Sequence, residues 1–427
     1  MRSGRSLPAL AVALAIVVWA VPLQFGVYAD SVITDIPTYQ RAYDLIAAGN
    51  IPYADFSLEY PPLAGALFWL AGVLPGPYGV TFSILMLVAL CATVLGVIAL
   101  ARALGMDERR QTVAGCMVAV SPLLIGNLVE TRFDLALSAL VVWTLWAAAT
   151  DRWRLAWTLL ACATLLKLVP LALIPVLIIW ERHRAGGRRA WAGLAGSLAV
   201  VAAGLLPFVI LSPSGTWDLA RYHLDRPLQL EAVGSGYLLG LHALAGIPVT
   251  VESSFGSQGL AGTGPAVIAG ISTAILIAVL IAISWTLWLL LHRARAPGDA
   301  RLFVAASAST LVALLVGGKV LSPQFLVWLL PVGFLVVGRY GPLAAGLTAA
   351  AMLLTFSYFP HQYWDLVALD TWPIVLLVLR DSVLIALLAA CWPRPSIAGR
   401  PQGRVLGQQG ADPRRAEKAV SARYLVD

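Results

Sequence analysis

The chain consists of long apolar runs separated by short polar segments, and this alternation constrains its fold more than any other feature. Hydrophobic residues make up 59% of the 427 residues and charged residues 12%, whereas a soluble domain carries about a quarter charged residues. A helix that crosses a bilayer needs roughly 20 mainly apolar residues, because in hydrocarbon the backbone polar groups must be satisfied within the segment. The sequence therefore predicts an all-α polytopic integral membrane protein.

Ten apolar runs have about the length of a transmembrane helix, and an eleventh run is ambiguous. The ten are residues 7–29, 79–104, 112–129, 134–150, 190–211, 265–291, 302–317, 322–338, 342–357 and 373–392. The ambiguous run, 155–180, contains Pro170 and Pro175. We expect about ten to twelve transmembrane helices. Residues 1–29 also fit a cleaved signal peptide, but we favour a first anchor because the run is long and the rest of the chain is membrane-embedded.

Basic residues at the ends of the runs orient the chain, because Lys and Arg are enriched in cytoplasmic loops. Threading the runs alternately satisfies this rule under two conditions. The run 61–74 must not cross, and it is short enough to form a helix along the membrane surface. The run 155–180 must enter and leave on the same side, as a hairpin of two short helices turning at 167–170. A single span that breaks the charge rule is the alternative.

This topology predicts one transmembrane catalytic domain over residues 1–393, in the plasma membrane. Its outer face receives a first loop, 30–78, with surface helices, and a long loop, 212–264. Residues 394–427 are rich in Arg, Gly, Gln and Pro and lack apolar periodicity, so we expect a disordered cytoplasmic tail. The net charge of +7 comes from basic residues that the threading places mainly on the cytoplasmic side of the membrane. We therefore expect no nucleic-acid partner.

Four basic residues lie within or beside spans away from the cytoplasmic ends. The threading places Arg132, Lys167 and Lys319 at the outer membrane boundary and Arg380 slightly deeper. Such charges usually face a cavity or a partner, and together they suit a phosphate anchored on a lipid. The alternatives are local: ion pairs with neighbouring carboxylates for the two arginines, and for Lys167 an extension towards the lipid interface.

The first outer loop is rich in carboxylates, namely Asp35, Asp44, Asp55 and Glu59. Asp35 follows the first span, and Tyr39 lies one helical turn later on the same face. A carboxylate beside a low-dielectric wall can serve as a general base, because burial raises its pKa. With a cationic phosphate site, this predicts that an acceptor hydroxyl loses its proton to Asp35 while a phosphate leaves. A merely solvated acidic loop is the alternative.

Three separated motifs carry a family resemblance. The first combines D-x-x-x-Y at Asp35 and Tyr39 with A-x-G-x-x-P-Y (47–53) and EYPPL (59–63); the others are LLKLVPLALIP (165–175) and KVLSPQFLVWLLP (319–331). In this order they resemble GT-C-fold glycosyltransferases of the glycosyltransferase 87 family, which includes phosphatidylinositol-mannoside mannosyltransferases. The resemblance covers roughly residues 10–392.

The resemblance implies a polyprenyl-phosphate-linked sugar donor, usually mannose, and an outward-facing site beneath short surface helices. It implies transfer without a nucleotide and with inversion at the anomeric carbon. Asp35 matches the family's catalytic acid of the first loop. Lys167, Lys319, Ser322 and Gln324 fall in motifs that border the donor cavity.

Other candidate residues follow from the outer loops. Tyr39, Glu59, Tyr60, His361 and Trp364 are candidates for substrate contacts, since an aromatic ring can stack on a sugar. The loop 212–264 is long enough to cover an acceptor, and loops of this length are usually functional. Some GT-C enzymes carry paired acids in the first loop and bind a metal. Here Ile36 follows Asp35, which favours a mechanism without a metal or other cofactor.

The sequence leaves competing functions open. The first is a membrane glycosyltransferase that moves a sugar, expected to be mannose, to a cell-envelope lipid or glycan. The second is a secondary transporter or lipid flippase, but transporters usually consist of two repeated halves, and no second copy of the D-x-x-x-Y and EYPPL block occurs. The third is a scaffold that has lost catalysis, against which the retention of Asp35 argues.

Overall fold

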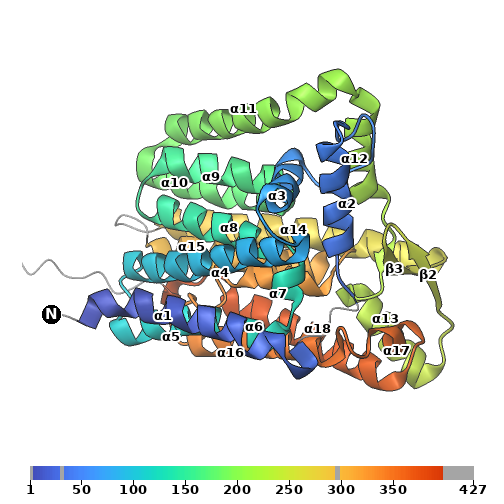
Figure 1. The fold of residues 1–427 in the computed structure, drawn as a ribbon. Coiled ribbons are helices and arrows are strands. Elements are labelled where there is room, and N and C mark those ends of the chain that lie inside the picture. The colour runs from blue at the N-terminus through green and yellow to red at the C-terminus, as the bar shows by residue number, and fades with distance from the viewer. Residues whose placement is uncertain (1–2, 29–32, 294–298, 398–427) are drawn as a thin grey trace, which may run out of the picture.

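The computed structural model describes residues 3–28, 33–293 and 299–397; most of the predicted tail, 398–427, lies outside this part of the chain. The predicted mainly helical membrane architecture is confirmed. In the described residues, six helices are long and apolar enough to cross a membrane: α4 (Tyr78–Ala103), α11 (Gly187–Leu211), α14 (Thr263–Arg293), α15 (Ala300–Gly317), α16 (Gly341–Tyr358) and α18 (Thr371–Cys391). They run roughly side by side (Figure 1).

Two predicted spans are interrupted helices. The run 7–29 contains α1 (Ser3–Ala20) and then two short 3-10 helices. The run 112–129 is divided among three helices, α5 (Glu108–Ala119), α6 (Ser121–Ile125) and α7 (Leu128–Thr131). Pro122 has no N–H to continue a helix from α5. Gly126, with φ at 74°, ends α6 in a conformation that favours glycine.

The predicted helix at 322–338 is wrong. The structure has a 3-10 helix, η4 (Pro323–Leu329), followed by turns. Most of these side chains are buried, among them Leu326, Leu329 and Leu335. Irregular backbone is tolerated at membrane depth where protein surrounds it, so a continuous apolar run did not need to be a helix here.

The predicted hairpin at 155–180 is confirmed. It consists of α9 (Trp153–Leu166), the 3-10 helix η3 (Val169–Leu173) and α10 (Ile174–Ala185). The indole N–H of Trp157 donates to the Glu181 carboxylate over 2.6 Å, and Arg184 forms a 2.5 Å ion pair with Asp151. The start of α9 and the end of α10 are therefore neighbours, and the turn between them lies at the far end.

The first outer loop forms two short helices, as predicted. These are α2 (Ile36–Ala47) and α3 (Pro62–Val73), each of 12 residues, which is too short to span a bilayer. In Figure 1, α2 runs across one end of the bundle rather than along it, as does α12 (Pro213–Asp225). These two helices enclose the region in which the predicted site residues meet.

The segment 212–264 is folded, which corrects the prediction of a long loop in an all-α chain. Besides α12 it contains α13 (Val233–Ala245) and a small antiparallel sheet in the order β1 (Leu228–Gln229), β3 (Ser257–Ala261), β2 (Thr250–Ser254). The β2–β3 turn has φ of 50° at Phe255 and 64° at Gly256. Two residues of positive φ form the tight turn whose twist matches paired strands. The strands are short and contain several polar residues, Ser253, Ser254, Ser257 and Gln258 among them, which weakened the sequence signal.

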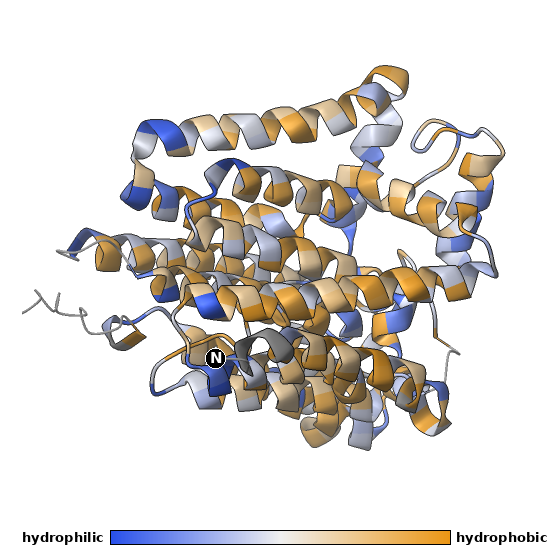
Figure 2. Ribbon diagram, turned by 60° about the vertical axis from the view of Figure 1, so that its left-hand side comes forward, coloured by the Kyte–Doolittle hydropathy of each residue, from blue (hydrophilic) through white to orange (hydrophobic). Residues whose placement is uncertain are grey.

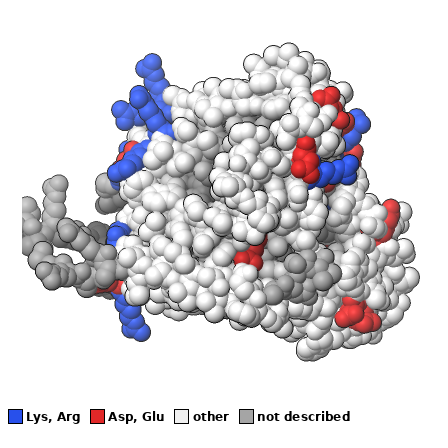
Figure 3. All heavy atoms as spheres, in the orientation of Figure 1, with Lys and Arg blue, Asp and Glu red and all other residues white. Residues whose placement is uncertain are grey.

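Charge is distributed unequally between the two ends of the bundle. Apolar residues cover the sides of the helices (Figure 2). On the face shown in Figure 3, Lys and Arg gather mainly at the end near the N-terminus, whereas most Asp and Glu lie at the end with α2 and α12. The predicted site therefore lies at the more acidic end.

Candidate active site

A cavity of about 650 Å³ opens beside α2 and α12. The predicted site residues that line it are Asp35, Glu59, Tyr60, Arg132, Lys167, Lys319, Ser322 and Gln324. They come from the first outer loop, the start of α8 (Asp134–Ala149), the hairpin turn and the segment after α15. The structure thus brings together residues from all three sequence motifs.

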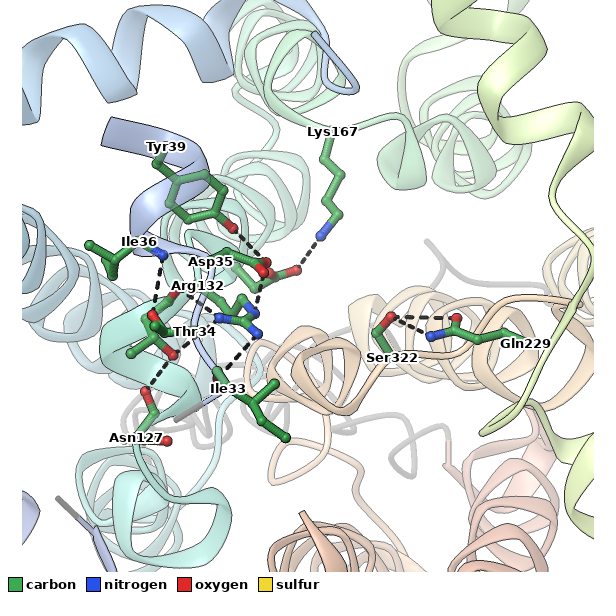
Figure 4. A network of polar contacts seen from close by, with 12 residues as sticks. Ile33, Thr34, Asp35, Ile36, Tyr39, Asn127, Arg132, Lys167, Gln229 and Ser322 are labelled. Atoms are coloured by element: carbon green, nitrogen blue, oxygen red, sulfur yellow. Dashed lines mark hydrogen bonds and ion pairs between the residues drawn. The ribbon is translucent and has the colours of Figure 1, made fainter. Parts of the chain in front are cut away.

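Asp35 forms an ion pair at the wall of this cavity. The Nε atom of Arg132 lies 2.8 Å from its carboxylate, and the Tyr39 hydroxyl donates to the same carboxylate over 3.2 Å (Figure 4). Asp35 is the N-cap residue of α2, but its side chain accepts no cap hydrogen bond. The carboxylate is 33% exposed and the Arg132 side chain only 5%. Asp35 is therefore held in place and remains reachable from the cavity.

Lys167 is held by a carboxylate and three aromatic rings. Its Nζ lies 2.7 Å from Asp134 and about 5 Å from the ring centroids of Phe133, Phe325 and Trp328, within the range of cation–π attraction. The indole N–H of Trp328 donates to the same Asp134 oxygen over 2.5 Å. Asp134 was not among the predicted site residues, and it fixes the position of Lys167.

Another wall is formed by the segment after α15. The Nζ of Lys319 donates to the carbonyl of Leu224, in the last turn of α12, over 2.5 Å. The backbone N–H of Gln229 donates to the carbonyl of Lys319 over 2.9 Å, and its side-chain amide donates to Ser322 over 3.0 Å (Figure 4). Burial lowers the pKa of Lys319. The end of α12 and β1 are thus attached to the Lys319–Ser322 segment.

Arg380 does not reach the cavity, which corrects its predicted placement. It is completely buried, forms a 2.7 Å ion pair with Asp381 and donates to the carbonyl of Glu231 over 2.6 Å. Glu231 lines the cavity, so Arg380 lies behind the wall. The space is tight: a Cβ at Gly236 would lie 1.9 Å from Asp381 Oδ2. The local alternative from the sequence, an ion pair with Asp381, is what the structure contains.

Three predicted substrate contacts lie away from the cavity. Tyr39 is 1% exposed and stacks on Phe68 with centroids 4.4 Å apart, so it supports Asp35 from behind. His361 lies 3.1 Å, through Nε2, from the carbonyl of Val27, and Trp364 is 57% exposed on the surface. From the same segment, Phe359 and Tyr363 line the cavity instead.

The sequence predicted that the segment 212–264 covers an acceptor, but it assigned none of the residues of α12 or of the β2–β3 turn to the site. Tyr222, His223 and Arg226 line the cavity, together with Phe255, Gly256 and Ser257. Burial raises the pKa of Glu59, which is hydrogen-bonded to Tyr222, and burial lowers the pKa of His223. The stretch RYHLDR (221–226) was the available signal, since it groups basic and aromatic residues in an outer segment.

These features define a multi-pass membrane protein with acids and cations gathered in one cavity at the end of its helical bundle. The model of glycosyltransferase family 87 matches residues 58–318, more than half of the chain, and the chain belongs to this family. It is therefore a membrane glycosyltransferase, and the resemblance drawn from the motifs is confirmed. The matched residues include Lys167 but not Asp35 or Lys319.

Among solved structures, the chain is similar to the crystal structure of ArnT from Cupriavidus metallidurans bound to undecaprenyl phosphate. The two share 15% sequence identity, with 92% of this chain and 79% of that chain covered and a TM-score of 0.48. A search of curated proteins gave no match.

Proposed function

We propose that the protein transfers a sugar, mannose by the family resemblance, from a polyprenyl-phosphate donor to a hydroxyl of a cell-envelope lipid or glycan. The observation that carries this proposal is the shared cavity: an ion-paired, reachable carboxylate, Asp35, and the cations Arg132, Lys167 and Lys319 line the same space. A reaction that removes a proton and releases a phosphate needs both groups within one site.

In the proposed step the acceptor oxygen bonds to the anomeric carbon as the bond from that carbon to the donor phosphate breaks. The hydroxyl proton passes to Asp35, and the electron pair stays on the phosphate, whose charge changes from −1 to −2. Cations of the cavity wall stabilise this added charge more in the transition state than in the ground state, and this difference accelerates the step. Attack opposite the leaving group gives inversion. The mechanism assigns no step to a metal or other cofactor.

A lipid-linked donor fits the apolar part of the cavity wall. Leu168, Val169 and Leu171 of the hairpin turn line it together with Leu276 of α14. Leu171 is 42% exposed, and apolar residues cover the sides of the helices around the bundle (Figure 2). A polyprenyl tail can therefore leave the cavity sideways into lipid while its phosphate stays near the cations.

The charge distribution supports an outward-facing site. By the positive-inside rule, the end rich in Lys and Arg in Figure 3 belongs in the cytoplasm. The cavity lies at the other end of the bundle, beside α2 and α12. We therefore place the site on the outer face of the plasma membrane and residues 394–427 on the cytoplasmic side.

The test is transfer from radiolabelled polyprenyl-phosphate mannose to candidate acceptors in membranes that contain the wild type or Asp35→Ala. We expect a glycosylated product with the wild type, none with Asp35→Ala although the variant still inserts, and an unchanged rate after EDTA treatment. Unchanged transfer by Asp35→Ala would remove this residue from the mechanism. Uptake of a water-soluble solute by proteoliposomes, without any glycosylated product, would favour a secondary transporter or flippase.

A further inference from the structure

The cations of the cavity differ in what neutralises them. Arg132 and Lys167 form ion pairs with Asp35 and Asp134, at 2.8 and 2.7 Å. Lys319 instead donates to a backbone carbonyl, that of Leu224. Among the residues that the structure describes, no carboxylate oxygen lies within ion-pair distance of Lys319 or of another cation in the same wall, Arg226.

Arg226 is positioned from two sides while its charge remains available. Its Nη2 donates to the hydroxyl of Ser257 over 2.9 Å, and its guanidinium lies 5.5 Å from the centroid of the Tyr222 ring. The Tyr222 hydroxyl in turn donates to the carbonyl of Phe255 over 2.8 Å. The β2–β3 turn thus holds the Arg226 side chain, which lines the cavity.

Arg226 and Lys319 are close enough for their charges to act together. Burial lowers the pKa of Lys319, the carboxylate of Asp225 opposes this shift, and the charge of Arg226 adds to it. The two residues are also connected through the chain, because Lys319 holds the carbonyl two residues before Arg226. Asp225 acts on Lys319 and Glu59 on Arg226 from a distance, but within the described part of the chain neither carboxylate reaches ion-pair distance. Two cations that repel each other in this way form a site that an anion would stabilise.

We propose that Arg226 and Lys319 bind the phosphate of the polyprenyl-phosphate donor, whereas Arg132 and Lys167 hold the carboxylates of Asp35 and Asp134. A guanidinium has five N–H donors and an ammonium has three, so donors remain at both after their contacts with Ser257 and Leu224. A phosphate can therefore add charge-assisted hydrogen bonds without displacing these contacts. This inference rests on the proposed function for the identity of the phosphate as that of a lipid-linked sugar.

The assignment also separates the two tasks of the cavity. Asp35 stays in its ion pair to accept the hydroxyl proton, and the leaving phosphate gains its second negative charge beside Arg226 and Lys319. Arg226 follows directly after α12, between that helix and β1. Binding of the donor phosphate therefore also attaches the end of α12 to the site.

The experiment uses the purified full-length protein with four single variants. Arg226→Gln removes the charge and Arg226→Lys keeps it. Ser257→Ala removes the bond that holds the guanidinium, together with the bond from the Ser257 hydroxyl to the Ser254 carbonyl in the same turn. Arg221→Gln is the matched control, because Arg221 lies on α12 with an exposed side chain and forms a 4.0 Å pair with Asp218. The readouts are KM and kcat for the polyprenyl-phosphate sugar, and protection against thermal unfolding by polyprenyl phosphate and, separately, by inorganic phosphate.

We expect Arg226→Gln to weaken binding of polyprenyl phosphate by roughly 10- to 100-fold, the range for a lost hydrogen bond to a charged group. We expect Arg226→Lys to recover part of this loss, Ser257→Ala to change binding far less, and Arg221→Gln to bind as the wild type does. Unchanged binding in Arg226→Gln, or an equal loss in Ser257→Ala, would overturn the assignment. Equal protection by inorganic phosphate alone would overturn the lipid-linked identity of the ligand.

These outcomes are distinguishable from a failure of the proposed function. If the wild type transfers no sugar but binds polyprenyl phosphate through Arg226, the transfer proposal fails and the phosphate site stands. If the wild type transfers sugar and Arg226→Gln keeps the wild-type KM and kcat, the proposed function stands and the phosphate assignment is wrong.

Discussion

Two arginine–aspartate pairs of similar length occupy different surroundings in this protein. The Arg132–Asp35 pair, at 2.8 Å, has a carboxylate that is 33% exposed. The Arg380–Asp381 pair, at 2.7 Å, is 0% exposed on both sides. Only the first can touch a substrate. Residue type and position within a span therefore do not decide whether a charged side chain can contact a substrate. Its exposure to the cavity does.

The buried pair instead supports the cavity wall. Arg380 donates to the carbonyl of Glu231, and Tyr358 donates to the Glu231 carboxylate over 2.9 Å. Two residues before Glu231, Gln229 is bonded to Lys319 and Ser322. Arg380 therefore positions the short segment that connects Arg226 and Lys319, the proposed phosphate-binding residues, to the bundle.

The largest effect on stability is expected from breaking the buried pair. Asp381→Asn leaves the Arg380 charge without its partner in a fully buried position, and removal of one member of such a pair typically costs about 3–5 kcal/mol. We expect a large loss of thermal stability in detergent, measured by the unfolding midpoint. The matched variant Arg132→Gln, at the partly exposed pair, should lose much less.

A double variant sharpens this test. Arg380→Met with Asp381→Leu removes both charges, and replacing a buried pair by apolar residues is often neutral or stabilising. We expect the double variant to be more stable than Asp381→Asn alone. Equal loss in both would show that the geometry of the pair, rather than the unpaired charge, maintains this region.

The pH dependence of stability tests the role of Glu231, which connects the Arg380–Asp381 pair to the cavity wall. Burial raises the pKa of Glu231 from 4.5 to about 7. Between these values the folded protein holds a proton that the unfolded chain has lost, so stability should fall as the pH rises from 4.5 to about 7. Thermal unfolding across this range measures the slope. Glu231→Gln should flatten the slope of stability against pH. If the slope is unchanged in that variant, other titratable groups cause it.

The smallest effects are expected at the surface residues that the sequence had suggested as substrate contacts. His361→Ala and Trp364→Ala should each change the transfer rate less than about two-fold, because surface substitutions away from buried networks have small effects. Tyr363→Ala, on the same segment but at the cavity, should reduce the rate more. The measurement is the initial rate of transfer at saturating donor. A larger loss of rate in His361→Ala than in Tyr363→Ala would contradict this prediction.

The sequence was most informative where the signal was local. The apolar runs predicted the long helices, the basic residues flanking 155–180 predicted the hairpin, and the acid after the first span pointed to Asp35. Position along an apolar run predicts depth in the membrane, and that depth stays a prediction. The direction of a side chain around its helix could not be predicted in this way, because it depends on packing, and for this reason Arg380 was placed in the cavity.

The rest depended on contacts between distant segments. The sheet in 212–264 pairs strands of only two to five residues, and the polar residues in them make their sequence resemble a loop. Arg226 reaches the cavity only because this sheet and α12 fold over it. The irregular run at 322–338 is apolar after Gln324, and without a helical or strand period such a run does not reveal its backbone conformation.

The most direct test of the account compares Asp35→Asn with Asp44→Asn, a second acid on α2, in the purified protein with saturating donor and acceptor. We predict that Asp35→Asn lowers kcat by about 10²- to 10⁴-fold, the usual contribution of a general base, while the donor KM and the unfolding midpoint change little. Asp44→Asn should retain the wild-type rate. A wild-type rate in Asp35→Asn, or an equal loss in both variants, would contradict the central claim that the carboxylate facing the cavity removes the acceptor proton.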